Sequence, residues 1–161
     1  MTGPAIRTDI VEVFPFARRG EDVVFLQLRR KNPPAAGSWQ PVMGHIEQGE
    51  RAVDAALREL TEETGLSPRM LPDGRALWQL EAVDTFFLAS ANCIMMCPGF
   101  AVEVDPDQAI TIDDAHDQYR WIASNEIEQA FLWPGQRHAA RQLMEEILAP
   151  AARLGIYLRL P

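Results

Sequence analysis

Residues 44–66 read GHIEQGERAVDAALRELTEETGL, a short loop bracketed by two glycines and followed by a strongly acidic segment. Apolar or small residues recur there at helical spacing and form one stripe: Val53, Ala56, Leu57, Leu60 and Thr64. Alanine and leucine favour helices, and Gly65 suits a left-handed helix end. The segment therefore predicts an amphipathic helix over residues 51–64 whose apolar side packs against a sheet.

The sequence on either side of this helix is typical of strands. Alternating or continuous apolar runs predict strands at residues 6–16, 23–30, 76–88, 93–104 and 118–123, with a short extended piece at 39–43. Helices are expected at 124–131 and 134–148, and an edge strand at 156–160. Strands that flank one central helix and precede terminal helices predict an α/β fold with helices on both faces of a mixed β-sheet, in one domain spanning residues 1–161.

The charge and the composition of the chain limit which ligands, metal ions and membranes it is expected to bind. The net charge of −8 argues against binding long DNA or RNA, whereas a small phosphate ester can approach if divalent cations neutralise both sides. Cys93 and Cys97 lack the neighbouring histidines of a zinc site, and two cysteines are compatible with a cytoplasmic location. Residues 85–102 carry no charge, but the turn at 90–92 favours two buried strands over a membrane span.

Three carboxylates in the acidic segment are the strongest chemical signal. Glu59, Glu62 and Glu63 are related by helical steps of three and four, so they are expected to share one face and repel each other. Arg58 can pair with Glu62 or with Glu50, but it cannot neutralise the whole set. Either the face is simply solvated, or it holds Mg²⁺ (with Mn²⁺ as a substitute), which prefers carboxylates, water and phosphate oxygens.

The spacing of these residues resembles the complete Nudix box. Gly44, five residues, Glu50, seven residues and then residues 58–66 match the pattern G-x₅-E-x₇-R-E-U-x-E-E-x-G-U, in which U is apolar. The resemblance implies an α/β/α sandwich and hydrolysis of a diphosphate linked to a further group. It also implies metal ligation by Glu59, Glu62, Glu63 and the carbonyl of Gly44, with Arg58 and Glu50 orienting the glutamates.

The general base is less defined than the metal ligands. Glu59 or Glu62 is the first choice, and carboxylates outside the box are alternatives: Glu103, Asp113, Asp114 and Asp117. Residues 113–121 resemble the segment E-H-x-x-Y-x-W of nucleotide-type Nudix enzymes, but Ala115 occupies the glutamate position. Asp114 is then the nearest substitute.

The substrate class is suggested by a second, weaker resemblance. The run Trp39-Gln40-Pro41-Val42-Met43-Gly44 is similar to that of dihydroneopterin triphosphate and dATP pyrophosphohydrolases, which implies a nucleoside or pterin triphosphate. Trp39 and Gln40 then become candidate substrate contacts, although a tryptophan that only packs is equally consistent. Arg29 is a candidate phosphate ligand, and neighbouring Arg30 should face the opposite way.

Two alternatives remain open at this point. One is a Nudix hydrolase of another nucleoside diphosphate derivative, such as a dinucleoside polyphosphate, ADP-ribose or a capped RNA. The other is a non-catalytic nucleotide-binding module, which would be favoured if a box glutamate were missing; each one is present. A homodimer is also left open.

Overall fold

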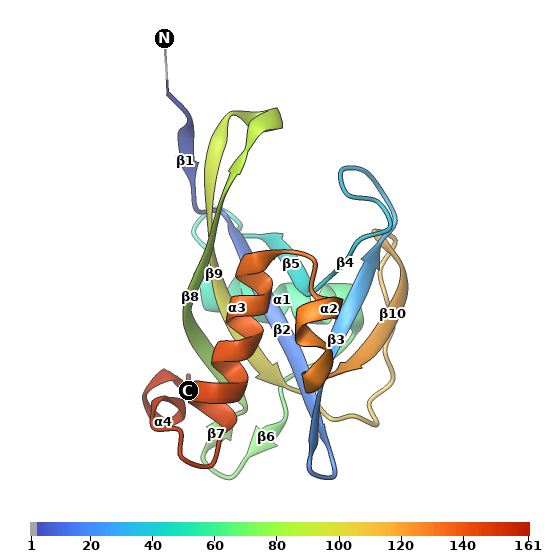
Figure 1. Ribbon diagram of the computed structural model, residues 1–161, viewed down its shortest axis with the longest axis vertical. Helices are drawn as coiled ribbons and strands as arrows, with labels where there is room; N and C mark the ends of the chain where they lie inside the picture. The colour runs from blue at the N-terminus through green and yellow to red at the C-terminus, as the bar shows by residue number, and fades with distance from the viewer. Residues whose placement is uncertain (1–2) are drawn as a thin grey trace.

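The computed structural model describes residues 3–161 and contains one large sheet between helices (Figure 1). The strands of that sheet are β1 (Ala5–Arg7), β2 (Ile10–Arg19), β3 (Asp22–Arg30), β4 (Trp39–Gln40), β5 (Val42–His45), β8 (Leu77–Leu88), β9 (Cys93–Glu103) and β10 (His116–Ala123). Two further strands, β6 (Met70–Leu71) and β7 (Gly74–Arg75), form a small separate hairpin. The strand regions predicted between residues 6 and 123 are thus confirmed, with shifted boundaries.

The sheet is mixed, as the sequence predicts. Its order is β1-β9-β2-β3-β10, with β8 on the other edge of β9, β5 beside β2 and β4 beside β3. Strand β9 runs parallel to both β1 and β2, while the remaining pairs are antiparallel. Strand β5 therefore lies against the first half of β2, where Val11 is opposite Gly44 and Glu12 is opposite Met43.

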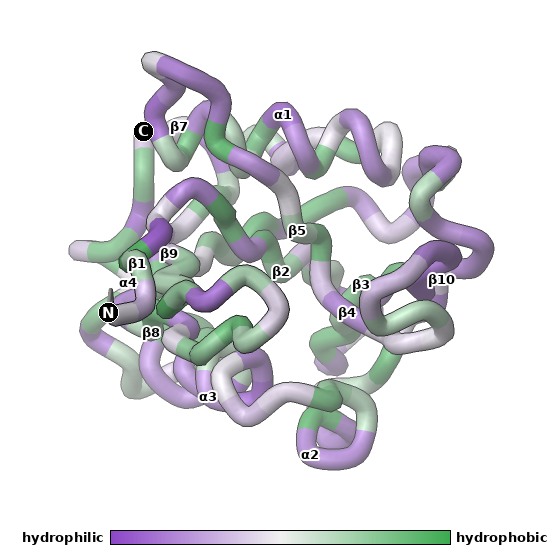
Figure 2. The backbone as a smooth tube through the Cα atoms, turned by 90° about the horizontal axis from the view of Figure 1, so that it is seen from above, coloured by the Kyte–Doolittle hydropathy of each residue, from purple (hydrophilic) through white to green (hydrophobic). Residues whose placement is uncertain are grey.

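Two hydrophobic cores lie on opposite faces of this sheet. Helix α1 (Ala52–Thr64) covers one face, on which Ala55, Ala56 and Leu60 pack against Val11 and Val13. Helix α3 (Pro134–Gln142) covers the other, where its residues pack against Phe14, Phe16 and Phe25. Figure 2 shows α1 and α3 on either side of β2 and β5. This is the predicted α/β/α arrangement, because successive residues of β2 point alternately to the two helical layers.

The acidic helix forms where the sequence places it. Helix α1 begins at Ala52 and ends at Thr64, and Gly65 adopts the left-handed conformation with φ 72° while its N–H bonds to the Thr61 carbonyl at 2.8 Å. A residue other than glycine adopts this backbone φ angle only with strain. The buried stripe, which includes Leu60, fixes which way the polar face of the helix turns.

The C-terminal region departs from expectation in two ways. A 3-10 turn, η2 (Ser124–Glu126), precedes the short α2 (Ile127–Ala130), and the predicted long helix continues from α3 as a π-helical segment, η3 (Leu143–Leu148). The predicted edge strand at 156–160 is wrong, because the chain forms helix α4 (Leu154–Leu158) instead. Only Leu158 of that helix is buried, and an isolated bridge between Trp78 and Arg159, with a hydrogen bond from the Trp78 indole N–H to the Gly155 carbonyl, joins the tail to the sheet.

The N-terminal prediction also needs correction. Residues 6–16 form two strands rather than one, because β1 pairs with the far end of β9 at residues 93–95 and β2 pairs with residues 99–103. Strands β2 and β3 stay paired up to Arg19 and Asp22, so the turn between them is tight. Strands β8 and β9, joined by the 3-10 turn η1 (Ala89–Ala91), extend beyond the rest of the sheet as a hairpin (Figure 1).

Within residues 3–161, no helix has the length and apolar character needed to cross a bilayer. The uncharged stretch at 85–102 forms the β8–β9 hairpin, as expected. Cys93 and Cys97 are buried on the same side of β9 and pack with Ile10 and Leu88.

Candidate active site

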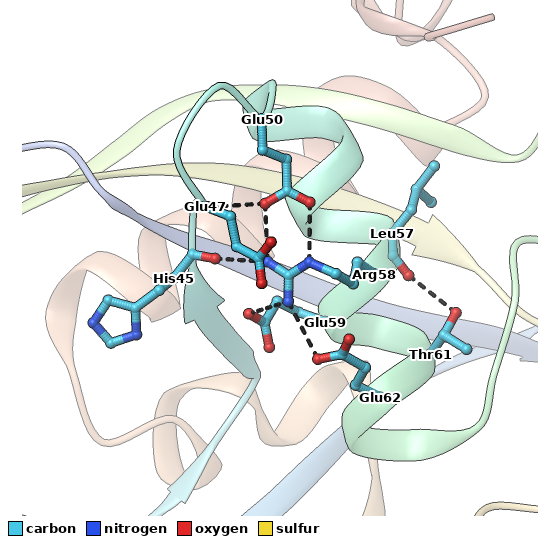
Figure 3. A network of polar contacts seen from close by, with 8 residues as sticks. All are labelled: His45, Glu47, Glu50, Leu57, Arg58, Glu59, Thr61 and Glu62. Carbon is cyan, nitrogen blue, oxygen red and sulfur yellow. Dashed lines mark hydrogen bonds and ion pairs between the residues drawn. The ribbon is translucent and has the colours of Figure 1, made fainter.

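Arg58, in the middle of α1, is the centre of a polar network between this helix and the loop before it (Figure 3). Its guanidinium makes a two-pronged contact with Glu50, donating from Nε to Oε1 and from Nη2 to Oε2, both at 2.9 Å. Nη1 donates to Glu59 at 2.8 Å and to Glu62 at 3.2 Å, and Nη2 donates to the His45 carbonyl at 2.7 Å. One arginine therefore joins Glu50 and the glycine-bracketed loop to Glu59 and Glu62 of the helix, whereas the sequence suggested a choice between Glu50 and Glu62.

Glu50 holds the loop as well as the arginine. Its Oε2 accepts a hydrogen bond from the Glu47 backbone N–H at 2.9 Å, and the pKa of Glu50 is lowered chiefly by the Arg58 contact and then by this backbone donor. The same contacts raise the pKa of the Arg58 guanidinium further above its usual range, with the Glu50 hydrogen bond as the main cause. Glu50 thus acts as a structural partner that orients Arg58.

Gly44 is required because Glu59 occupies the space next to it. A Cβ added at residue 44 would lie 1.8 Å from Cδ of Glu59. Gly44 has no left-handed φ angle, so its role is close approach rather than backbone freedom. The carboxylate of Glu59 thereby lies directly against the backbone of β5, which places it beside the Gly44 peptide that the resemblance marks as a metal ligand.

Glu63 lies deeper than the other two glutamates. It is only 7% exposed, and burial, followed by the nearby charges of Asp113 and Glu59, raises its pKa to about 8. The Met43 backbone N–H and the charge of Arg30 act in the opposite direction. Its Oε2 is buried and has no hydrogen-bond partner among the described residues. A buried carboxylate oxygen without a partner is costly, which suits a position that a cation completes.

The chemistry of this donor set fits a hard divalent cation. Within residues 3–161, no three His, Cys, Asp or Glu side chains already stand in metal-binding geometry. Glu59 and Glu62 instead accept hydrogen bonds from Arg58, and the side chain of Glu62 is 59% exposed. Oxygen donors on neighbouring helical turns, with one buried oxygen left unpaired, fit Mg²⁺ with water and substrate as its remaining ligands.

The predicted substrate residues lie in different layers. Arg29 is on the α3 face and its guanidinium donates to both carboxylate oxygens of Asp117, at 2.7 and 2.8 Å. Arg30 has the opposite orientation, as predicted, and it lies close enough to Glu63 to affect that carboxyl. Gln40 is buried at 6% exposure. Trp39 carries the Arg120 guanidinium over its ring, 4.2 Å from the centroid.

The candidate bases outside the box are separated by the fold. Glu103 is 4% exposed and pairs with Arg69 at 3.0 Å and with Arg18 at 3.5 Å, two arginines that are themselves exposed, so it is occupied by ion pairs. Asp114 is exposed, whereas Asp113 contacts Nδ1 of His116 at 2.7 Å and is one of the charges acting on Glu63. Asp113, rather than Asp114, is therefore the outside carboxylate directed toward the box.

The loop that carries Asp113 is fastened to the end of α1. The Thr111 N–H donates to the Thr64 carbonyl at 2.9 Å, and the Gln108 side chain donates to the Gly65 carbonyl at 3.2 Å. Sequence spacing gave no sign of these long-range bonds. The buried pair Glu12 and Gln136, on the opposite face of the sheet, was also missed, since a single glutamate in an apolar strand has no motif around it.

Comparison with known proteins supports the resemblance. The model of the NUDIX domain matches residues 6–143. An octanoyltransferase from Myxococcus xanthus is 36% identical over 120 residues, which is 74% of this chain but 31% of that protein. The chain thus spans about a third of the length of that curated relative.

Solved structures agree on the fold. The Caenorhabditis elegans Ap4A hydrolase has a TM-score of 0.69 at 17% identity, and the match covers 86% of this chain and 96% of that one. The Escherichia coli dihydroneopterin triphosphate pyrophosphohydrolase has a TM-score of 0.65 at 22% identity, with coverages of 86% and 96%. With the family model spanning most of its length and the box geometry intact, this chain belongs to the NUDIX domain family.

Proposed function

We propose that this protein is a Mg²⁺-dependent pyrophosphohydrolase that cleaves a diphosphate linkage in a nucleoside or pterin triphosphate. The observation that carries the proposal is the Arg58 network, which holds Glu50, Glu59, Glu62 and the carbonyl of His45 around one guanidinium. A solvated acidic face would not need an arginine with several hydrogen bonds, nor a glycine in contact with Glu59.

The residues of the box have distinct tasks in this proposal. Glu59, Glu62 and Glu63, with the carbonyl of Gly44, would hold the divalent cation, which neutralises phosphate charge and makes a bound water more acidic. Arg58 orients Glu59 and Glu62 through its hydrogen bonds, and Glu50 orients Arg58. Glu59 or Glu62 accepts the proton of the attacking water, and Asp113 is the alternative acceptor outside the box.

The substrate class rests on the residues near β4 and on the overall charge. The Trp39 ring, already paired with the Arg120 guanidinium, offers a flat surface for a heterocycle. The net charge of −8 favours a small anionic substrate that brings its own divalent cations over a long nucleic acid. A free triphosphate nucleotide meets both conditions.

A substrate panel tests the proposal directly. The purified chain is incubated with purine and pyrimidine nucleoside triphosphates, dihydroneopterin triphosphate, Ap4A, ADP-ribose and 5′-triphosphorylated RNA, with Mg²⁺ and with EDTA, and products are identified by mass. We expect Mg²⁺-dependent release of pyrophosphate and a monophosphate from at least one triphosphate. Preferential cleavage of Ap4A or ADP-ribose would replace the proposed substrate class, and no cleavage of any member would reject the enzymatic function.

A further inference from the structure

A second polar cluster lies on the α3 face of the sheet, away from the Nudix box. Its centre is the pair Glu12 of β2 and Gln136 of α3, each only 1% exposed. The Gln136 side-chain amide donates from Nε2 to Oε1 of Glu12 at 3.3 Å. Asp84 of β8 lies close to Glu12, on which its charge acts, and to the first turn of α3, where a Cβ at Gly135 would be 1.9 Å from its Oδ1.

The hydrogen bonding of this cluster is incomplete. Oε1 of Gln136 is buried and has no partner among the described residues. Its Nε2 has a long bond to Glu12 and a contact of 3.8 Å with the Met43 sulfur, which is a weak acceptor. An unsatisfied buried amide oxygen destabilises a folded protein, so Oε1 of Gln136 is a position at which a further hydrogen-bond donor would be favourable.

The electrostatics favour an uncharged partner. Burial, and then the charge of Asp84, raises the pKa of Glu12 to about 8, so at neutral pH this carboxyl carries its proton. A protonated carboxyl donates one hydrogen bond and accepts another, and the Gln136 amide does the same. The pair therefore suits the edge of a planar amide or amidine, whereas a phosphate oxygen would meet the nearby Asp84 carboxyl.

The position of the cluster relates it to the box. Met43 lies opposite Glu12 in the β2–β5 register, and the next residue of β5 is Gly44, which contacts Glu59 on the other face. The Trp39 and Arg120 pair belongs to the same α3 face. In Figure 1 the N-terminal end of α3 lies between the β8–β9 hairpin and the β3–β4 loop. One strand thus links the glutamates to the buried pair.

We propose that Glu12 and Gln136 are specificity-determining residues that hydrogen-bond the donor–acceptor edge of the heterocycle carried by the substrate. Met43, whose flexible thioether now contacts Gln136, gives way to the heterocycle. This assignment rests on the proposed function, because it presumes that the box holds the phosphates of the same molecule. Beyond that function, it assigns recognition of the base or pterin ring to hydrogen bonds from residues of β2 and α3.

Binding measurements separate this role from catalysis. Dissociation constants are measured by calorimetry with Mg²⁺ for methylene-bridged analogues of GTP, ATP, UTP and CTP and for inorganic tripolyphosphate, which has no heterocycle. The ratio of nucleotide affinity to tripolyphosphate affinity reports on the nucleoside, and since all four analogues share the ribose, the differences among them report on the ring. Gln136→Met and Glu12→Leu should lower this ratio about 10- to 100-fold for the analogue that binds tightest, because each removes a buried hydrogen-bonding partner. Glu12→Gln, which keeps a donor and an acceptor, should change it less than about threefold.

Gln142→Met is the matched control on the same helix. Gln142 is also buried, but its Oε1 accepts from the Ala82 N–H at 3.0 Å, so it serves the fold. The control should lower the melting temperature and leave the affinity ratio unchanged. An unchanged ratio in Gln136→Met, an equal change in the control, or a native protein that binds tripolyphosphate as tightly as every analogue would overturn the inference. Absence of hydrolysis in the substrate panel, with the ratio behaving as expected, would reject the proposed function alone.

Discussion

Glu59 lies so close to Gly44 that a methyl group on residue 44 would overlap its carboxyl carbon, at 1.8 Å. The two residues are fifteen positions apart and belong to α1 and β5. Their contact fixes the distance between the acidic helix and the loop in front of it. Since Arg58 binds Glu59 and the His45 carbonyl as well, the helix and the loop form one rigid unit.

Gly44→Ala should therefore displace Glu59 and lower kcat by roughly 10²- to 10³-fold, the size of one misplaced electrostatic group. The measurement is steady-state hydrolysis of the best substrate from the panel. Gly3→Ala is the control, since a Cβ at Gly3 meets nothing within 4 Å. Full activity in Gly44→Ala would show that Glu59 does not need its observed place.

Replacing Arg58 by lysine keeps the charge but removes the fork. A lysine cannot contact both oxygens of Glu50 and also reach Glu59, so the glutamates lose their orientation. We expect kcat to fall roughly 10- to 100-fold and the Mg²⁺ concentration for half-maximal activity to rise. A metal titration of activity checks this, and a variant with an unaltered Mg²⁺ profile would count against the orienting role.

Glu62→Gln tests metal binding with little effect on the fold. The Glu62 side chain is 59% exposed, so its loss should leave the melting temperature nearly constant. We expect turnover to fall by roughly 10²- to 10³-fold. Asp54→Asn, on the exposed side of the same helix, is the control and should keep native turnover. Isothermal titration with Mn²⁺ would then reveal whether affinity for the ion is lost in the first variant only.

Asp113 and Asp114 are adjacent and give a matched comparison. Asp113 contacts His116 and acts on Glu63, whereas Asp114 is exposed. Asp113→Asn should reduce kcat at least about tenfold, in line with a group that helps proton transfer or its positioning, and Asp114→Asn should have little effect. The two kcat–pH profiles check this expectation, and the reverse order would restore Asp114 as the substitute suggested by sequence.

The pH dependence of stability tests the state of Glu12. Its pKa is about 8 in the folded protein and 4.5 in the unfolded reference, so between these values only the folded chain keeps the proton. The contribution of Glu12 to the free energy of unfolding is therefore largest below pH 4.5, and it decreases as the pH rises toward 8. Glu12→Gln removes this decline. Between pH 5 and pH 8 the free energy of unfolding of the variant, relative to that of the native protein, should therefore rise by roughly 2–4 kcal/mol. Urea unfolding of both proteins at several pH values measures the difference, and parallel curves would contradict the raised pKa.

Individual helices and strands could be predicted from the sequence because apolar spacing and helix-ending glycines act over a few neighbouring residues. Helix α1 follows from its apolar stripe and from Gly65, and β2 and β3 follow from continuous apolar runs. The prediction of a strand at 156–160 was wrong, since five residues are too few to distinguish a strand from a helical turn, and the packing of this segment on η3 favours helix α4. The break between β1 and β2 likewise depends on β9, a partner more than eighty residues away.

The sequence by itself determined the acidic helix, the glycine-bracketed loop and the spacing of the box, because backbone preference and hydrophobic periodicity act over a few residues. Only the tertiary structure decided that Arg58 binds Glu50, Glu59 and Glu62 together, that Glu63 is buried with the charge of Asp113 nearby, and that Glu12 meets Gln136 across 124 positions. Those relations arise when the sheet brings distant strands and helices together. Burial then changes the cost of each charge, which the identity of a residue alone does not reveal.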